Sequence, residues 1–266
     1  DPTGTERVRG DRHMVGLGWQ HPIGVQGAGR FTVSRASFGY GEDVTEARLN
    51  GARVWFNRSR EAELTVRYDL TAQLGALGEL TAGAVVRRLG TLTRMEAPFG
   101  SFLPLVPSGR VQPFRIDSTM PSGIEGVHLQ ISRDAGPAQL TAGVRADRFD
   151  LAEAIRVSPR LAAAIRLSPV LDLTAAVGRY HQQVPLVYLA AIDGNRSLSP
   201  MRADHAIVGV SWTPAPALKI TLEGYEKRYA AYPVATGIPQ LTLANAGDSY
   251  DVVLSLIHIS EPTRLR

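Results

Sequence analysis

The residues that most often carry chemistry, namely histidine, serine, cysteine and the glycines of phosphate loops, form no catalytic pattern in this sequence. The chain has six histidines and no cysteine. It contains no HExxH motif and no histidine pair four residues apart, so a catalytic metal site has no support. G-x-S-x-G and G-x-x-x-x-G-K-[ST] motifs are also absent, and the glycines of residues 24–29 fit a turn between strands better than a phosphate loop. We therefore predict a protein that is not an enzyme, with no catalytic residue, no metal ligand and no cofactor.

Charged residues that alternate with apolar residues are the more physical candidates. In residues 61–70, Glu and Arg positions alternate with Ala62, Leu64, Val66 and Leu70. A period of two predicts a strand with one apolar and one polar face. The alternation returns near 139–147, 160–167 and 218–227. The polar faces, which we expect to line a wet interior and to contact other polar groups through water and ion pairs, carry Arg53, Glu61, Glu63, Arg67, Asp69, Arg145, Asp147, Arg160, Arg166, Lys219 and Glu223.

The strands that carry these residues favour a transmembrane β-barrel. No stretch approaches the ~18 uninterrupted apolar residues of a membrane-spanning helix. The apolar faces are rich in Ala, Val and Leu, the polar faces are charged, and aromatic residues tend to lie at strand ends, as in outer-membrane barrels. A soluble antiparallel sandwich also alternates, so a soluble β-rich binding protein stays open as an alternative. The formal charge of +4 is spread among acidic residues, which argues against nucleic-acid binding.

Connection lengths support the same architecture, because outer-membrane barrels have short periplasmic turns and long outer loops. Residues 134–137, 168–170 and 213–217 are tight and contain proline, and longer segments separate them, except that the connection over 150–155 is short. Arg58 and Arg60 interrupt the apolar face of one long strand, either where it leaves the hydrocarbon or at a turn that splits it. We predict strands over 12–20, 29–38, 52–72, 77–90, 125–134, 137–149, 156–167, 170–182, 204–213 and 216–230, and the start of another near 248.

The long outer loops are 91–124, 183–203 and 231–247, and loops held by a rigid scaffold are where binding groups concentrate. The first of them offers apolar side chains and cationic side chains that suit an anionic chelate. The candidate solute contacts are Met95, Phe99, Phe102, Arg110 and Arg115.

Residues 137–245 carry an ordered series of motifs. A strand that ends in Arg and Asp is followed by Ser158-Pro159-Arg160, and later segments read GRYHQQVP, NRSLSPM and EGYEK. In this order the segments resemble the later barrel of TonB-dependent receptors, with matches at Gly178, Tyr180, Gln182, Pro185, Asn195, Leu198, Pro200, Gly209, Tyr225 and Lys227. The sequence departs from that pattern at Met201, where the family has Glu, and by one extra residue between Gln182 and Pro185.

The resemblance implies an all-β, antiparallel up-and-down transmembrane barrel in the outer membrane of a Gram-negative cell. It also implies active uptake of a scarce solute, such as a metal chelate or siderophore complex, with energy from the TonB complex through a plug domain. The chain supplies about 11 strands of the about 22 of such transporters, so we expect an incomplete barrel without its plug. The expected partners are outer-membrane lipid, the TonB complex and a small solute. A porin-like passive barrel is the alternative.

The last residues, LSLIHISEPTRLR, break the alternation of the strands. They resemble translated adapter sequence at the ends of assembled reading frames. We therefore expect a partial barrel over 1–253 and a non-native tail over 254–266.

Overall fold

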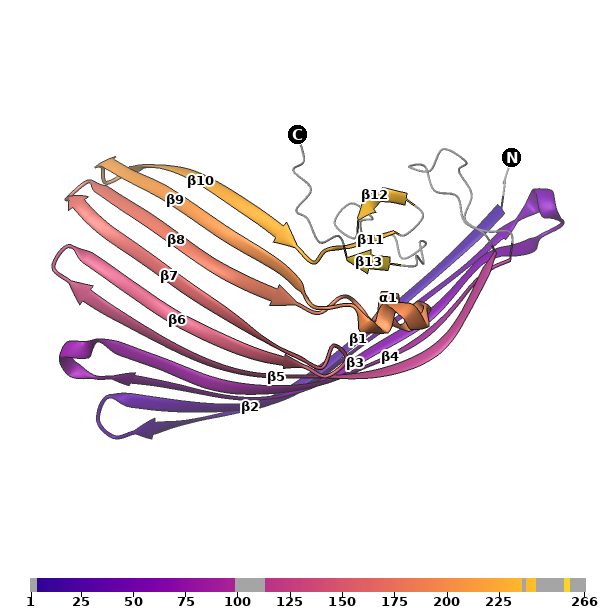
Figure 1. Ribbon diagram of the computed structural model, residues 1–266, viewed down its shortest axis with the longest axis horizontal. Helices are drawn as coiled ribbons and strands as arrows, with labels where there is room; N and C mark the ends of the chain where they lie inside the picture. The colour runs from indigo at the N-terminus through magenta and orange to yellow at the C-terminus, as the bar shows by residue number, and fades with distance from the viewer. Residues whose placement is uncertain (1–3, 99–112, 236–237, 243–255, 259–266) are drawn as a thin grey trace.

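One antiparallel sheet makes up most of the molecule. The computed structural model describes residues 4–98, 113–235, 238–242 and 256–258. Ten strands follow one another in the sheet in the order of the sequence, each pairing with the next (Figure 1). They are β1 (Gly4–Ile23), β2 (Gly27–Glu46), β3 (Ala52–Gln73), β4 (Glu79–Ala97), β5 (Phe114–Ala135), β6 (Ala138–Phe149), β7 (Ala154–Ser168), β8 (Leu171–Gln182), β9 (Met201–Ala215) and β10 (Leu218–Ala230).

The remaining described elements are short. Three strands, β11 (Pro233–Ala235), β12 (Ile238–Thr242) and β13 (Leu256–His258), form a second sheet in the order β12-β11-β13. The helices are α1 (Leu186–Ala191) and three 3-10 turns, η1 (Ala47–Leu49), η2 (Gly75–Leu77) and η3 (Asp193–Ser197). The predicted all-β, antiparallel, up-and-down fold is confirmed. The predicted strand start near 248 lies outside the described residues, and the boundary before residue 254 stays a prediction.

The large sheet is curved and open, with β1 and β10 as its two edges. Helix α1 lies on the inner side of the curve, which we call the concave face, and the opposite side is the convex face (Figure 1). Directly paired residues of an antiparallel ladder share a face, so the register assigns every strand position to one of the two. The sheet is not closed, and the prediction of an incomplete barrel is confirmed.

The two ends of the sheet differ as predicted. At one end, the turn end, the connections are 24–26, 74–78, 136–137, 169–170 and 216–217. In the two-residue turn after β5, Gly136 has a φ of 62°, a conformation that glycine adopts without steric cost. At the other end, the loop end, the long segment 183–200 joins β8 to β9, whereas the connections 47–51 and 150–153 are as short as those of the turn end. Short turns at one end and longer loops at the other are typical of outer-membrane barrels.

The predicted loop over 91–124 is wrong in extent, because β4 continues to Ala97 and β5 begins at Phe114. The ladder runs unbroken to the pair Ala97↔Phe114. Beyond Val86 both faces of β4 contain polar residues, so alternation of hydropathy no longer marks the strand while backbone pairing still does. β3 is also continuous across Arg58 and Arg60, which excludes the alternative of a turn there.

Candidate functional site

Nearly all of the charged residues that the sequence predicts to line a wet interior lie on the concave face. One row of paired residues across β3 to β7 joins Asp69, Gly83, His128, Arg145 and Ser158. The same register and alternation place on this face Glu61, Glu63, Arg67, Asp69, Arg145, Asp147, Arg160, Arg166, Lys219 and Glu223. The alternation read from the sequence therefore assigned these residues to one common face.

Arg53 is the exception, and a β-bulge is the reason. Val44 pairs with Trp55 but Thr45 pairs with Arg53, so one extra residue of β3 reverses the alternation. Arg53 consequently lies on the convex face. There its guanidinium forms an ion pair with Asp43 at 3.0 Å and lies 4.8 Å from the ring centre of Phe56.

Three neighbouring sets of ion-paired side chains lie on the concave face, and together we call them the charged cluster: Glu63, Arg67, Asp69, Arg87, His128, Arg145 and Asp147. Arg87 donates two hydrogen bonds to the Glu63 carboxylate, at 2.9 and 2.6 Å. Arg145 does the same to Asp147 at 2.7 and 2.6 Å. Arg67 donates to Asp69 at 2.6 and 2.8 Å, and His128 Nε2 lies 3.8 Å from Asp69 Oδ1. Two-pronged arginine pairs of this kind are geometrically specific and hold the carboxylates in place.

Two glycines make room for the cluster. A Cβ atom at Gly83 would come within 2.5 Å of the His128 ring and 2.8 Å of Asp69 Oδ1. A Cβ atom at Gly126 would overlap Asp147 and lie 2.6 Å from Arg145 Nη2. The side chains of the cluster therefore lie against the backbone of Gly83 and Gly126, in space that a residue with a Cβ atom would fill.

Arg87 and His128 belong to the cluster but were not among the predicted residues. Arg87 is adjacent to Arg88, so the local sequence does not show which arginine is on which face. The register shows it, because Arg87 pairs with Thr65 on the concave face and Arg88 with Leu64 on the convex face.

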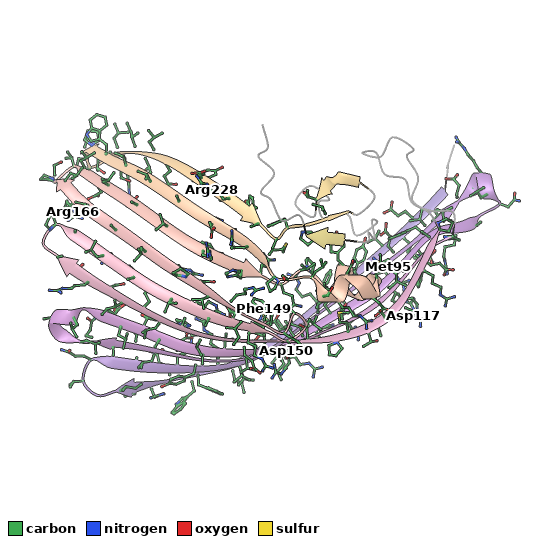
Figure 2. The ribbon with its side chains drawn as sticks, in the orientation of Figure 1. Met95, Asp117, Phe149, Asp150, Arg166 and Arg228 are labelled. Carbon is green, nitrogen blue, oxygen red and sulfur yellow. The ribbon has the colours of Figure 1, made fainter. Side chains whose placement is uncertain are left out.

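The other concave candidates lie outside the cluster. Arg160 lies over the ring of Tyr180, 4.5 Å from its centre. Arg166 lies near the turn end (Figure 2), and its Nε is 3.3 Å from Asp172 Oδ1. Lys219 and Glu223 are exposed on the edge strand β10.

The five residues predicted as solute contacts in the outer loop do not lie together. Phe99, Phe102 and Arg110 lie outside the described residues. Arg115 is exposed on β5 and pairs with Glu96 on the convex face. Met95 is only 1% exposed and lies beside α1 (Figure 2). Met95 is thus part of a packed core and not of an open loop.

That core lies on the concave face near the loop end. The segment after β8 folds over β4 and β5, and all its residues from Leu186 to Ala190, together with Val184, are buried. They pack with Trp55, Met95, Ile116 and Met120 of the sheet and with Leu198 and Met201. We call residues 184–198 the inward segment. Burial of its apolar side chains is the driving force that holds it on the sheet.

A buried amide strengthens the fold of the inward segment. Asn195 is 1% exposed, and its Nδ2 donates a hydrogen bond of 2.9 Å to the carbonyl oxygen of Tyr188. The amide of Tyr188 donates to the carbonyl oxygen of Pro185 at 3.1 Å. The first bond joins η3 to α1, and the second closes the turn at the start of α1.

The convex face carries a continuous apolar belt. On β3 it runs from Ala62 to Ala72 in alternate positions, eleven residues, which matches the 9 to 11 residues of a tilted membrane-spanning strand. Large side chains in this belt are widely exposed, including Leu17 at 81% and Leu222 at 75%. Soluble proteins rarely expose apolar surface on this scale, so this face requires an apolar environment.

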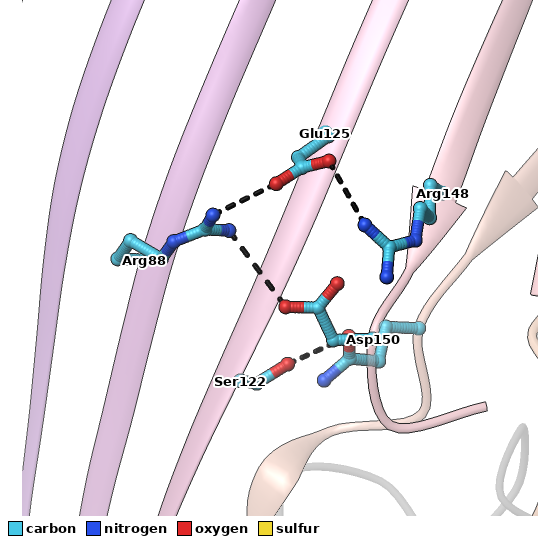
Figure 3. A network of polar contacts seen from close by, with 6 residues as sticks. Arg88, Ser122, Glu125, Arg148 and Asp150 are labelled. Atoms are coloured by element: carbon cyan, nitrogen blue, oxygen red, sulfur yellow. Dashed lines mark hydrogen bonds and ion pairs between the residues drawn. The ribbon is translucent and has the colours of Figure 1, made fainter. Parts of the chain in front are cut away.

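Ion pairs border the belt on the side of the loop end (Figure 3). Arg88 donates to Glu125 at 2.7 Å and lies 3.7 Å from Asp150. Arg148 approaches Glu125 from the other side at 3.3 Å. The absence of a side chain at Gly123 leaves the space in which Arg88 and Asp150 meet. The convex face thus changes from apolar to charged along each of these strands.

Within the described residues, no group of three or more His, Asp or Glu side chains could hold a metal ion. The helices in the same part of the chain fall short of the length and hydropathy that a membrane-spanning helix needs.

Comparison with known families gives the class of protein. The family model described as "TonB dependent receptor-like, beta-barrel" matches residues 1–251. The chain therefore belongs to the TonB-dependent receptor family, whose members are outer-membrane transporters and not enzymes. No curated protein sequence gave a match.

Solved structures share the fold. The ferripyoverdine receptor of Pseudomonas aeruginosa bound to ferripyoverdine superposes with a TM-score of 0.64 at 13% identity, over 92% of this chain and 36% of that one. The ferric-catecholate import receptor Fiu of E. coli K12 gives 0.62 at 11% identity, over 88% and 42%. The copper transporter OprC gives 0.61 at 13% identity, over 85% and 40%. The chain spans about 40% or less of the length of most such structures, at identities that establish the fold alone.

Proposed function

We propose that this chain forms part of the wall of a TonB-coupled transporter that takes up a scarce solute, such as a metal chelate, across a Gram-negative outer membrane. The family match over residues 1–251 carries the proposal. The two-faced sheet supports it, because the convex belt fits lipid and the concave face fits a polar interior. The similar structures are named for different solutes, namely ferripyoverdine, ferric catecholate and copper, and we therefore propose a metal or metal chelate as the class of solute.

In this proposal the charged cluster faces the plug domain. Its carboxylates and guanidinium groups are paired with one another but remain partly exposed, for example 38% for Arg87 and 31% for Glu63. Paired, hydrated charges can exchange hydrogen bonds with a neighbouring polar surface at small cost. Such a surface allows a plug to be held and then displaced.

The inward segment is the part of the loop end that a solute would pass. It lies on the concave face, closer to the loop end than the charged cluster is, and a packed apolar core holds it there. We propose that it narrows the entrance of the transporter as a fixed element. The predicted contacts Phe99, Phe102 and Arg110 stay candidates for the first capture of an anionic chelate, whereas Arg115 lies on the convex face of β5, away from the interior.

The test is solute uptake by the full-length receptor that contains this chain. It is produced in a strain without its own ferric-chelate receptors, and uptake of radioactive iron as ferripyoverdine or a ferric catecholate is measured. We expect uptake with at least one chelate, and its loss when TonB is deleted. If the receptor takes up none of the chelates, the proposal that its solute is a metal chelate is contradicted.

The same assay separates active transport from a porin-like barrel. Uptake that persists at an unchanged rate after TonB deletion would contradict energy coupling and favour passive flow. As a control for delivery to the membrane, the receptor is quantified in the outer-membrane fraction of both strains.

A further inference from the structure

An apolar groove crosses the convex face from β5 to β8. Its volume is 590 Å³, which lies in the range of ligand-sized pockets, roughly 300 to 1,000 Å³. The small side chains of Ala142, Ala163 and Ala175 form its floor, and the larger side chains of Leu161 and Val177 rise beside them. The register explains the hollow, because Ala163 pairs with Ala175 and two small residues therefore lie next to each other on this face.

Arg133 is the one charged residue among those that line the groove. It lies on β5, two residues before the strand ends at the turn end, and it is exposed. Within the described residues no carboxylate lies within ion-pairing distance of Arg133, whereas convex arginines near the loop end, such as Arg88 and Arg148, are paired with Glu125. An unpaired guanidinium at the edge of an apolar surface favours an external anion.

We propose that this groove is a binding site for an anionic glycerophospholipid, with an acyl chain along the alanine floor and the phosphate on Arg133. The proposal rests on the proposed function, since it requires the convex face to lie in the membrane. The turn end is the periplasmic end of outer-membrane barrels, so Arg133 lies near the headgroups of the inner leaflet. A long arginine side chain can keep its stem on apolar surface while its guanidinium reaches such headgroups.

The two halves of the site recognise different parts of the lipid. Apolar walls and an alanine floor take a flexible hydrocarbon chain without a hydrogen-bonding requirement. The guanidinium of Arg133 can donate two parallel hydrogen bonds to one phosphate. A lipid with both parts should therefore bind more tightly than one with the chain alone.

The experiment is native mass spectrometry of the full-length receptor in detergent, titrated with phosphatidylglycerol or with diacylglycerol of the same chains. We expect one saturable phosphatidylglycerol site. Arg133→Gln should weaken it about tenfold, the size expected for loss of a charge-assisted hydrogen bond, and leave diacylglycerol binding unchanged. Ala163→Leu, which fills the floor, should weaken both lipids. Ala84→Leu, on the convex face of β4 outside the groove, is the matched control and should bind as the unsubstituted receptor does.

Equal phosphatidylglycerol binding by the unsubstituted receptor and both groove variants would overturn the site, as would a second protein chain cross-linked into the groove. Fractionation keeps this result separate from the proposed function. A receptor that sediments with the outer membrane but has no saturable lipid site contradicts only the groove proposal, whereas one absent from the membrane contradicts the proposed function.

Discussion

The packing of the inward segment on the sheet can be weakened by one substitution, Leu189→Ala. Leu189 is 2% exposed within the core that joins α1 to β4 and β5. Truncation of a buried leucine to alanine costs about 2 to 5 kcal/mol, through lost burial and the cavity left behind. With about 3 kcal/mol lost, opening of the segment becomes about 100 times more frequent.

Hydrogen exchange of the full-length receptor in detergent measures this opening. The amides of Tyr188, Asn195 and Leu198 are hydrogen-bonded within the segment and report on it. We expect their exchange to accelerate about 100-fold while the strands keep their protection, because local packing and not the ladder is lost. Leu49→Ala, at a leucine that is 42% exposed in η1, is the matched control. Unchanged protection of the segment in Leu189→Ala would refute the assignment of this core as its anchor.

Three further changes test the two faces of the sheet. Leu129→Lys, in the middle of the convex belt, should cost about 2 to 4 kcal/mol of folding into lipid vesicles, whereas Leu129→Phe is tolerated; equal folding of both would contradict the lipid contact. Gly126→Val should lower the free energy of unfolding by about 1 to 3 kcal/mol through its clash with the arginine–aspartate pair, and Gly90→Val, where a Cβ meets no neighbour, should have a smaller effect in the same denaturation assay. A double-mutant cycle of Glu63→Gln and Arg87→Gln should give a coupling below about 1 kcal/mol, because both side chains are about one-third exposed; a coupling of several kcal/mol would show that the cluster is far less hydrated than we infer.

Much of the sheet could be predicted from the sequence because its signals are local. Residues 61–70 alternate strictly, and β3 has the predicted faces from Trp55 onward. The proline and glycine turns separate strands where expected, as at Gly136. The family could also be inferred, since its motifs lie in order along 137–245 and the family model matches 1–251.

The prediction failed near the loop end, where the inward segment covers the concave face of the strands and the convex face is charged. In β4 beyond Val86 both faces contain polar residues, and at the start of β5 the apolar and polar faces are exchanged, with Ile116 and Met120 on the concave face and Arg115 on the convex face. The sequence therefore predicts a loop over residues 91–97 and 114–124, which the structure places in strands. This error placed Met95 among solute contacts. Only the pairing with β5 and the cover of α1 reveal it as a core residue.

The sequence by itself determined the alternation, the turn positions and the family, because each depends on residues close together along the chain. The tertiary structure decided which charges meet. His128 reaches Asp69 across two strand boundaries, and a single bulge moves Arg53 to the opposite face. The alanine groove likewise exists only through the register of neighbouring strands. Register is a property of pairs of strands, since a shift of one residue reverses every face, and it is therefore settled only when the whole sheet has formed.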